Sequence, residues 1–137
     1  SWMGIGQYND LVTPIAMLRF VSAVANEGVA KEPVLLKRGN SGGTRLLKKE
    51  TAAEIKEMMS YNVSYAYGAG RFPNLKICAK SGTAEVGEGA SHSWFVGFLD
   101  DSENPLAFTV VIERGGGGLA NAGAVANAVL QAAVEDK

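Results

Sequence analysis

The sequence predicts an α/β fold of the α+β type, an antiparallel sheet flanked by helices. Residues 14–25 are so apolar at helical spacing that this helix must be largely buried. Residues 92–99 and 106–113 carry apolar side chains on both faces of a strand, a pattern typical of strands that helices cover on both sides. Short turns separate successive strands, so neighbouring strands are expected to run antiparallel.

Composition narrows the function without identifying it. The 137 residues suffice for one domain or part of one, and 47% apolar and 20% charged residues are ordinary for a folded soluble chain. The net charge of -1 provides no excess of positive charge to attract nucleic acid, so nucleic acid is not an expected partner. One cysteine and one histidine leave no internal disulfide and too few ligands for a zinc site, so we expect no metal and no cofactor. No apolar run of about 18 residues predicts a membrane span.

The first helix has recognisable ends. Thr13 is a good N-cap, Pro14 suits the first helical position, and Gly28 is the expected left-handed residue at the other end. Residues 33–36 are expected to be extended, and residues 37–45 to form a polar hairpin or loop. The basic side chains in and after this loop are expected to be solvated rather than to bind an anion.

Thr51 and Glu54 have capping-box spacing, which predicts a second helix starting near residue 51 and ending around residue 60. An aromatic and glycine-rich connection, residues 64–73, follows it.

Residues 75–85 are the most informative stretch. Apolar and polar side chains alternate over residues 75–80, which predicts a strand, and the stretch continues as Lys80-Ser81-Gly82-Thr83. Lys80 and Gly82 should point to one face, and Ser81 and Thr83 to the other. A cation, two hydroxyls and a backbone left open at Gly82 suit an anionic, peptide-like ligand. The residues alone also allow a polar strand end that runs into a turn.

Glycines punctuate the rest of the chain. Gly97, inside the strand of residues 92–99, is expected to leave room for a packed helix. The glycine run at residues 115–118 has no P-loop lysine after it, so we expect a mobile connection rather than a phosphate site. It leads to a last helix over residues 121–134 with a stripe of small residues.

Lys80-Ser81-Gly82-Thr83 resembles the third motif, Lys-(Ser/Thr)-Gly, of the serine acyltransferases that include penicillin-binding proteins and β-lactamases. Gly4-Ile5-Gly6-Gln7, followed by Val12-Thr13-Pro14, resembles the penicillin-binding protein transpeptidases in particular. So does Ser91-His92-Ser93-Trp94-Phe95-Val96-Gly97-Phe98 after the motif. The resemblance covers nearly the whole chain, in the same order.

This resemblance implies that residues 1–137 are the C-terminal portion of a transpeptidase domain, a partial penicillin-binding transpeptidase or β-lactamase-like fold. It implies that Lys80 supplies positive charge near the nucleophile and the substrate carboxylate. Ser81 would join the network that moves protons between catalytic groups, and Gly82 would lie against the substrate. The Thr83 hydroxyl would bind the carboxylate, and the Thr83 N–H would form half of the oxyanion hole.

The motif that supplies the nucleophile in these enzymes, Ser-x-x-Lys, has no counterpart here, because no serine is followed by lysine three positions later. Ser60-Tyr61-Asn62 has the form of the middle motif, Ser-x-Asn, but in the transpeptidases that motif precedes the Gly-x-Gly-Gln segment. We expect Ser60-Tyr61-Asn62 to be a helix end without a catalytic role. Both motif regions are therefore expected upstream, in a longer parent protein, and the chain alone is expected to be inactive.

The resemblance implies a parent that cross-links peptidoglycan stem peptides, with their D-alanyl-D-alanine ends as substrate and β-lactams as inhibitors. Such a parent works on the extracytoplasmic face of the bacterial membrane, with any anchor upstream. A β-lactam sensor or a non-enzymatic binding domain on the same scaffold is the alternative, and an upstream Ser-x-x-Lys would argue against the binding domain.

Overall fold

The computed structural model describes residues 11–34 and 42–135. The Gly4-Ile5-Gly6-Gln7 segment and residues 35–41, which include part of the expected extended piece and polar loop, lie outside the described residues.

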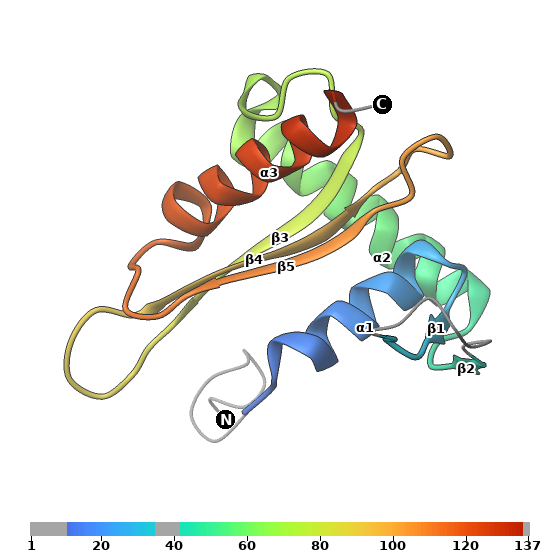
Figure 1. Ribbon diagram of the computed structural model, residues 1–137, viewed down its shortest axis with the longest axis horizontal. Helices are drawn as coiled ribbons and strands as arrows, with labels where there is room; N and C mark the ends of the chain where they lie inside the picture. Colours follow the sequence, from blue (N-terminus) through green and yellow to red (C-terminus); the bar gives the residue numbers. More distant parts are fainter. Residues whose placement is uncertain (1–10, 35–41, 136–137) are drawn as a thin grey trace.

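A three-stranded antiparallel sheet forms the centre of the fold (Figure 1). Its strands are β3 (Ile77–Ala84), β4 (His92–Leu99) and β5 (Ala107–Ile112), in that order across the sheet. In the register, Val96 of β4 lies between Lys80 of β3 and Thr109 of β5. Within the described residues, β3 and β5 are therefore the two edges of the sheet. Successive strands pair antiparallel, as the short turns between them predicted.

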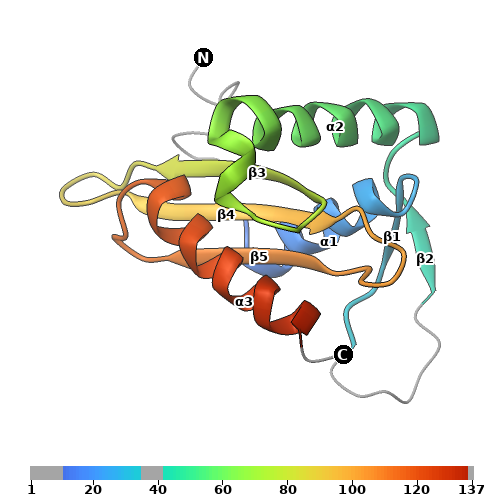
Figure 2. The ribbon, with the colours of Figure 1, turned by 90° about the horizontal axis from the view of Figure 1, so that it is seen from above.

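Helices cover both faces of this sheet. Figures 1 and 2 show α3 (Gly123–Glu135) on one face and α1 (Pro14–Ala25) on the other, with α2 (Lys49–Tyr61) alongside β3. The hydrophobic core has one cluster on each face of the sheet. Phe95 of β4 packs in the cluster that includes Leu130 of α3, whereas Phe98 of the same strand packs in the cluster that includes Val24 of α1. The prediction of a strand apolar on both faces and covered by helices is confirmed.

The ends of α1 follow the sequence signals, but its burial does not. The Thr13 side chain accepts the N–H of Ala16, and Gly28 adopts φ +87°, as predicted. Val21 and Val24 are buried, yet Ile15 is 55% exposed, so the helix is buried only toward its C-terminal half. Hydrophobic spacing shows which residues a helix can bury, but burial also needs a neighbouring element.

Of the local predictions before the sheet, the capping box is wrong, whereas only residues 33 and 34 of the expected extended piece are described. The chain forms a small antiparallel hairpin of β1 (Val29–Lys31) and β2 (Gly43–Arg45), and residues 32–34 are in no strand. The expected capping box does not form, because α2 begins at Lys49 and so places Thr51 inside its first turn. Lys48 occupies the N-cap position without a side-chain cap bond.

The α-helix α2 ends at Tyr61, where the sequence predicted a helix end. The chain continues beyond it as a π-helix, η2 (Asn62–Gly68), and then as a 3₁₀ turn, η3 (Ala69–Arg71). The connection expected over residues 64–73 is thus mostly helical, and it brings the Tyr67 side chain back to Ser81 of β3. Within the described part of the chain, no helix combines the length and hydrophobicity needed to cross a membrane.

Gly97 is required by a strand rather than by a helix. It pairs with Ala79 of β3, and a Cβ on Gly97 would lie 2.2 Å from the carbonyl oxygen of Cys78. The last helix, α3, begins at Gly123, close to the predicted start at residue 121, and a π-helical turn, η4 (Gly118–Ala122), precedes it.

Candidate active site

The sequence Lys80-Ser81-Gly82-Thr83 occupies the second half of β3, an edge strand. Cys78, two residues before Lys80, packs in the cluster on the α1 face, whereas Ala79 packs in the cluster on the α3 face. Because side chains alternate along a strand, Lys80 and Gly82 share the face of Cys78, and Ser81 and Thr83 share the face of Ala79. This confirms the predicted division of the four residues between two faces.

The backbone of Ser81 faces the outer edge of the sheet. Its N–H donates to the hydroxyl of Tyr67 at 2.8 Å, on the side of β3 away from β4. The N–H and C=O of one residue in an antiparallel strand point to the same side, and this side alternates from residue to residue. The N–H and C=O of Thr83 therefore also face the outer edge, while those of Lys80 and Gly82 face β4.

Lys80 is exposed, and its Nζ donates to the backbone carbonyl of Ser81 at 2.7 Å. The ammonium group therefore lies at the outer edge of β3, beside the backbone groups that point out of the sheet. A cation and backbone donors together at an edge can bind a ligand with a carboxylate and a peptide-like backbone.

Tyr67 is the residue at this site that the sequence did not single out. Besides accepting the Ser81 N–H, its hydroxyl lies 3.1 Å from Ser81 Oγ. Its ring lies 6.0 Å from that of Phe95, centroid to centroid, and so is anchored at the core. From the sequence, Tyr67 is only an aromatic residue in the connection before β3. No local pattern shows that η2 places its side chain against the strand.

The glycine run packs against the same strand instead of forming only a loose connection. The N–H of Gly118 donates to Thr83 Oγ1 at 3.3 Å, and Gly118 is buried. A Cβ on Gly118 would lie 2.3 Å from the carbonyl oxygen of Gly82 and 2.7 Å from that of Trp94. Glycine at position 118 therefore permits a close backbone approach beside Thr83.

Ser93 holds this glycine segment to β4. Its side chain is 0% exposed, and its hydroxyl donates to the carbonyl of Gly117 at 3.0 Å. The same oxygen accepts the N–H of Ala122 at 3.0 Å. One buried hydroxyl thus fixes the start of η4 against the sheet, next to Lys80-Ser81-Gly82-Thr83.

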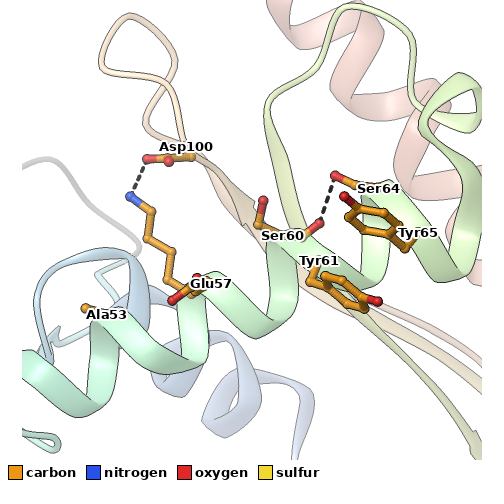
Figure 3. Close-up of a pocket in the computed structure, with 8 residues that line it drawn as sticks. Ala53, Glu57, Ser60, Tyr61, Ser64, Tyr65 and Asp100 are labelled. Carbon is orange, nitrogen blue, oxygen red and sulfur yellow. Dashed lines mark hydrogen bonds and ion pairs between the residues drawn. The ribbon is translucent and has the colours of Figure 1, made fainter.

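A cavity outside the Lys80-Ser81-Gly82-Thr83 segment lies at the other end of β3. It has a volume of about 510 Å³ and lies beside the ion pair of Lys56 Nζ and Asp100, 2.6 Å apart (Figure 3). The N–H of Asp100 bonds to the carbonyl of Lys76, the residue just before β3, so the cavity is at the start of the strand and Thr83 near its end. The residues that line it are Ala53, Lys56, Glu57, Ser60, Tyr61, Ser64, Tyr65 and Asp100.

Ser60-Tyr61-Asn62, the Ser-x-Asn look-alike, lies at this other end, where α2 becomes η2. Figure 3 shows Ser60 and Tyr61 beside the cavity, with the Ser64 hydroxyl bonded to the carbonyl of Ser60 at 3.2 Å. Its place agrees with the expectation of a helix end.

The remaining candidate groups have structural surroundings. His92 Nδ1 accepts the backbone N–H of Arg114 at 2.9 Å. Burial, with a further contribution from the charge of Asp100, raises the pKa of the Cys78 thiol to about 11, so this thiol stays protonated near neutral pH. Among the described residues, no three His, Cys, Asp or Glu side chains are grouped to hold a metal ion.

Known proteins resemble this chain over most of its length. Residues 1–134 match the family model described as penicillin binding protein transpeptidase domain. The peptidoglycan D,D-transpeptidase PbpA of Mycobacterium tuberculosis is 28% identical over 150 residues, an alignment of 96% of this chain and 30% of that protein. The peptidoglycan D,D-transpeptidase MrdA of Haemophilus influenzae is 27% identical over 159 residues, an alignment that covers 93% of this chain and 24% of that protein.

A solved structure is similar as well. The imipenem acyl-enzyme complex of penicillin-binding protein A from M. tuberculosis superposes with a TM-score of 0.78 and is 28% identical, with 97% of this chain and 33% of that one covered. The chain thus spans about a third or less of the length of these relatives. The match over residues 1–134 shows that the chain belongs to the penicillin-binding protein transpeptidase domain family.

Proposed function

We propose that the chain forms one wall of the active-site cleft of a peptidoglycan D,D-transpeptidase, which cross-links stem peptides through an acyl-serine intermediate and binds β-lactams. The observation that carries the proposal is the position of Lys80-Ser81-Gly82-Thr83 on the outer edge of β3. The relatives support it, since two are named peptidoglycan D,D-transpeptidases and a similar solved structure is an imipenem acyl-enzyme complex.

Each residue has a role that its position allows. Lys80 places a positive charge at the edge, where it attracts the carboxylate of a stem peptide or β-lactam and stabilises a deprotonated nucleophile. The Thr83 N–H faces the same edge and donates to the oxyanion of the tetrahedral intermediate, and losing such a donor costs about 3–4 kcal/mol. The Thr83 hydroxyl binds the substrate carboxylate, and Ser81 takes part in proton transfer.

The catalytic serine and its general base come from another part of the parent protein, because no Ser-x-x-Lys occurs in this sequence. Without a nucleophile the covalent route is absent, so the chain alone has no transpeptidase activity. The natural partners are the D-alanyl-D-alanine end of the stem peptide and the missing upstream part of the same protein. Since peptidoglycan lies outside the membrane, the parent works on the extracytoplasmic face.

Acylation kinetics of the parent with a fluorescent penicillin test this proposal. Lys80→Ala should lower the acylation rate about 100-fold or more, because a charged group that stabilises the transition state is lost. Lys76→Ala is the matched control, since Lys76 is also exposed but lies at the start of β3, beside Asp100. An unchanged rate for a folded Lys80→Ala variant would remove Lys80 from the cleft and refute the proposal.

A further inference from the structure

Tyr67 reaches the candidate active site from η2, an element outside the Lys-Ser-Gly motif. Its hydroxyl contacts Ser81 twice, accepting the backbone N–H at 2.8 Å and lying 3.1 Å from Oγ. The ring is half-buried and tilted by 52° against Phe95 at the core. The hydroxyl is therefore held in place by packing as well as by its hydrogen bonds.

The two contacts determine the direction of the Ser81 hydroxyl. A phenol oxygen has one hydrogen, and here the oxygen already accepts the Ser81 N–H. Its hydrogen is left for Ser81 Oγ, which then acts as acceptor toward Tyr67. Ser81 consequently keeps its own hydrogen for a second partner, away from Tyr67.

The same contacts close the edge of β3 at Ser81. Its N–H is taken by Tyr67, and its C=O accepts from Lys80 Nζ at 2.7 Å. An extended ligand that adds to an open strand edge needs both groups of a residue that faces outward. At Ser81 both groups are occupied by side chains of the same chain, so the Ser81 backbone does not pair with such a ligand.

We propose that Tyr67 is a positioning residue: its hydroxyl orients Ser81 for proton transfer and occupies the Ser81 N–H, so that this N–H does not pair with a peptide-like ligand. This inference rests on the proposed function. Tyr67 itself does not touch the substrate, and acts through the backbone and hydroxyl of Ser81.

The test is Tyr67→Phe in the parent protein, which removes the hydroxyl and keeps the ring against Phe95. The limiting rate of penicillin acylation should fall about tenfold, the factor that about 1.4 kcal/mol produces. The half-saturating penicillin concentration should change less than about twofold, because the ligand's own binding groups remain. Tyr65→Phe is the matched control: Tyr65 is also in η2, but it is 74% exposed and stacks on Tyr61, with ring centroids 4.4 Å apart (Figure 3).

Combining Tyr67→Phe with Ser81→Ala separates a positioning role from a general loss of stability. If Tyr67 acts through Ser81, most of the tenfold loss should disappear in the Ser81→Ala background, whereas independent losses would multiply and overturn the inference. A Tyr67→Phe variant that acylates like the wild type would also overturn it. If Lys80→Ala loses acylation in the same assay while Tyr67→Phe does not, only this inference fails; if Lys80→Ala is unaffected, the proposed function itself fails.

Hydrogen exchange provides a test that does not depend on a variant folding. The Ser81 amide lies on the edge of β3 that has no strand partner among the described residues, yet the Tyr67 hydroxyl accepts it. In the wild-type parent this amide should exchange more slowly than the amides of the exposed residues 87–90 in the β3–β4 turn. Exchange as fast as in that turn would contradict the proposed contact.

Discussion

Gly118→Ala is the substitution whose cost can be worked out most directly from the structure. A Cβ at this position would lie 2.3 Å from the Gly82 oxygen, 2.7 Å from the Trp94 oxygen and 2.9 Å from the Gly82 nitrogen. All three atoms belong to backbone inside a paired sheet, so no side chain can rotate away to make room. Overpacking of this kind costs about 1–3 kcal/mol, and three backbone contacts place Gly118→Ala at the upper end, near 3 kcal/mol.

Urea unfolding of the chain measures this cost. With a slope of about 2 kcal/mol per molar urea, a loss of about 3 kcal/mol lowers the midpoint by about 1.5 M. The neighbouring Gly117→Ala is the matched control, because Gly117 has φ -68° and ψ 128°, and the nearest atom to its added Cβ is 4.0 Å away. Gly117→Ala should leave the midpoint unchanged or raise it slightly. Equal midpoints for the two variants would refute the close approach of Gly118 to β3.

The buried thiol of Cys78, whose pKa is raised to about 11, should resist iodoacetamide in the folded chain at pH 8 and react once urea unfolds it; rapid labelling of the folded chain would contradict this. The free energy of unfolding should also fall as the pH rises from 9 to about 11, because in that range the unfolded thiol loses its proton and the folded thiol keeps it. Ser93→Ala should cost about 1–3 kcal/mol in urea unfolding, since it leaves the buried N–H of Ala122 without its acceptor. Ser102→Ala, at an exposed bend, should cost almost nothing, and a Ser93→Ala variant as stable as this control would argue against the buried network.

The strands and the motif could be predicted because their signals are local. Apolar and polar side chains alternate over residues 75–80, which identifies a strand. Because successive side chains of a strand point to opposite faces, this strand places Lys80 and Ser81 on opposite faces. Apolar side chains on both faces of residues 92–99 likewise required cover on both sides. Both predictions depend on residues within a single strand.

The surroundings of the motif could not be predicted because they depend on distant segments. Tyr67 contacts Ser81 across 14 positions, and Gly118 contacts Thr83 across 35. A run of glycines has the same sequence pattern whether it forms a loose loop or packs its backbone closely against a strand. The packing of Gly118 against β3 could therefore not be predicted from the sequence. The overestimated burial of Ile15 has a related cause, since spacing does not reveal whether a neighbour is present.

The position of a bound β-lactam in the parent protein is the measurement that decides the role of β3. In a crystal structure of the acyl-enzyme, the proposed function predicts the acyl carbonyl oxygen about 3 Å from the Thr83 nitrogen. It also predicts the drug's carboxylate beside Lys80 Nζ and the Thr83 hydroxyl. An acyl group bound away from β3, with neither Thr83 nor Lys80 in contact, would contradict the assignment of this strand to the active-site wall.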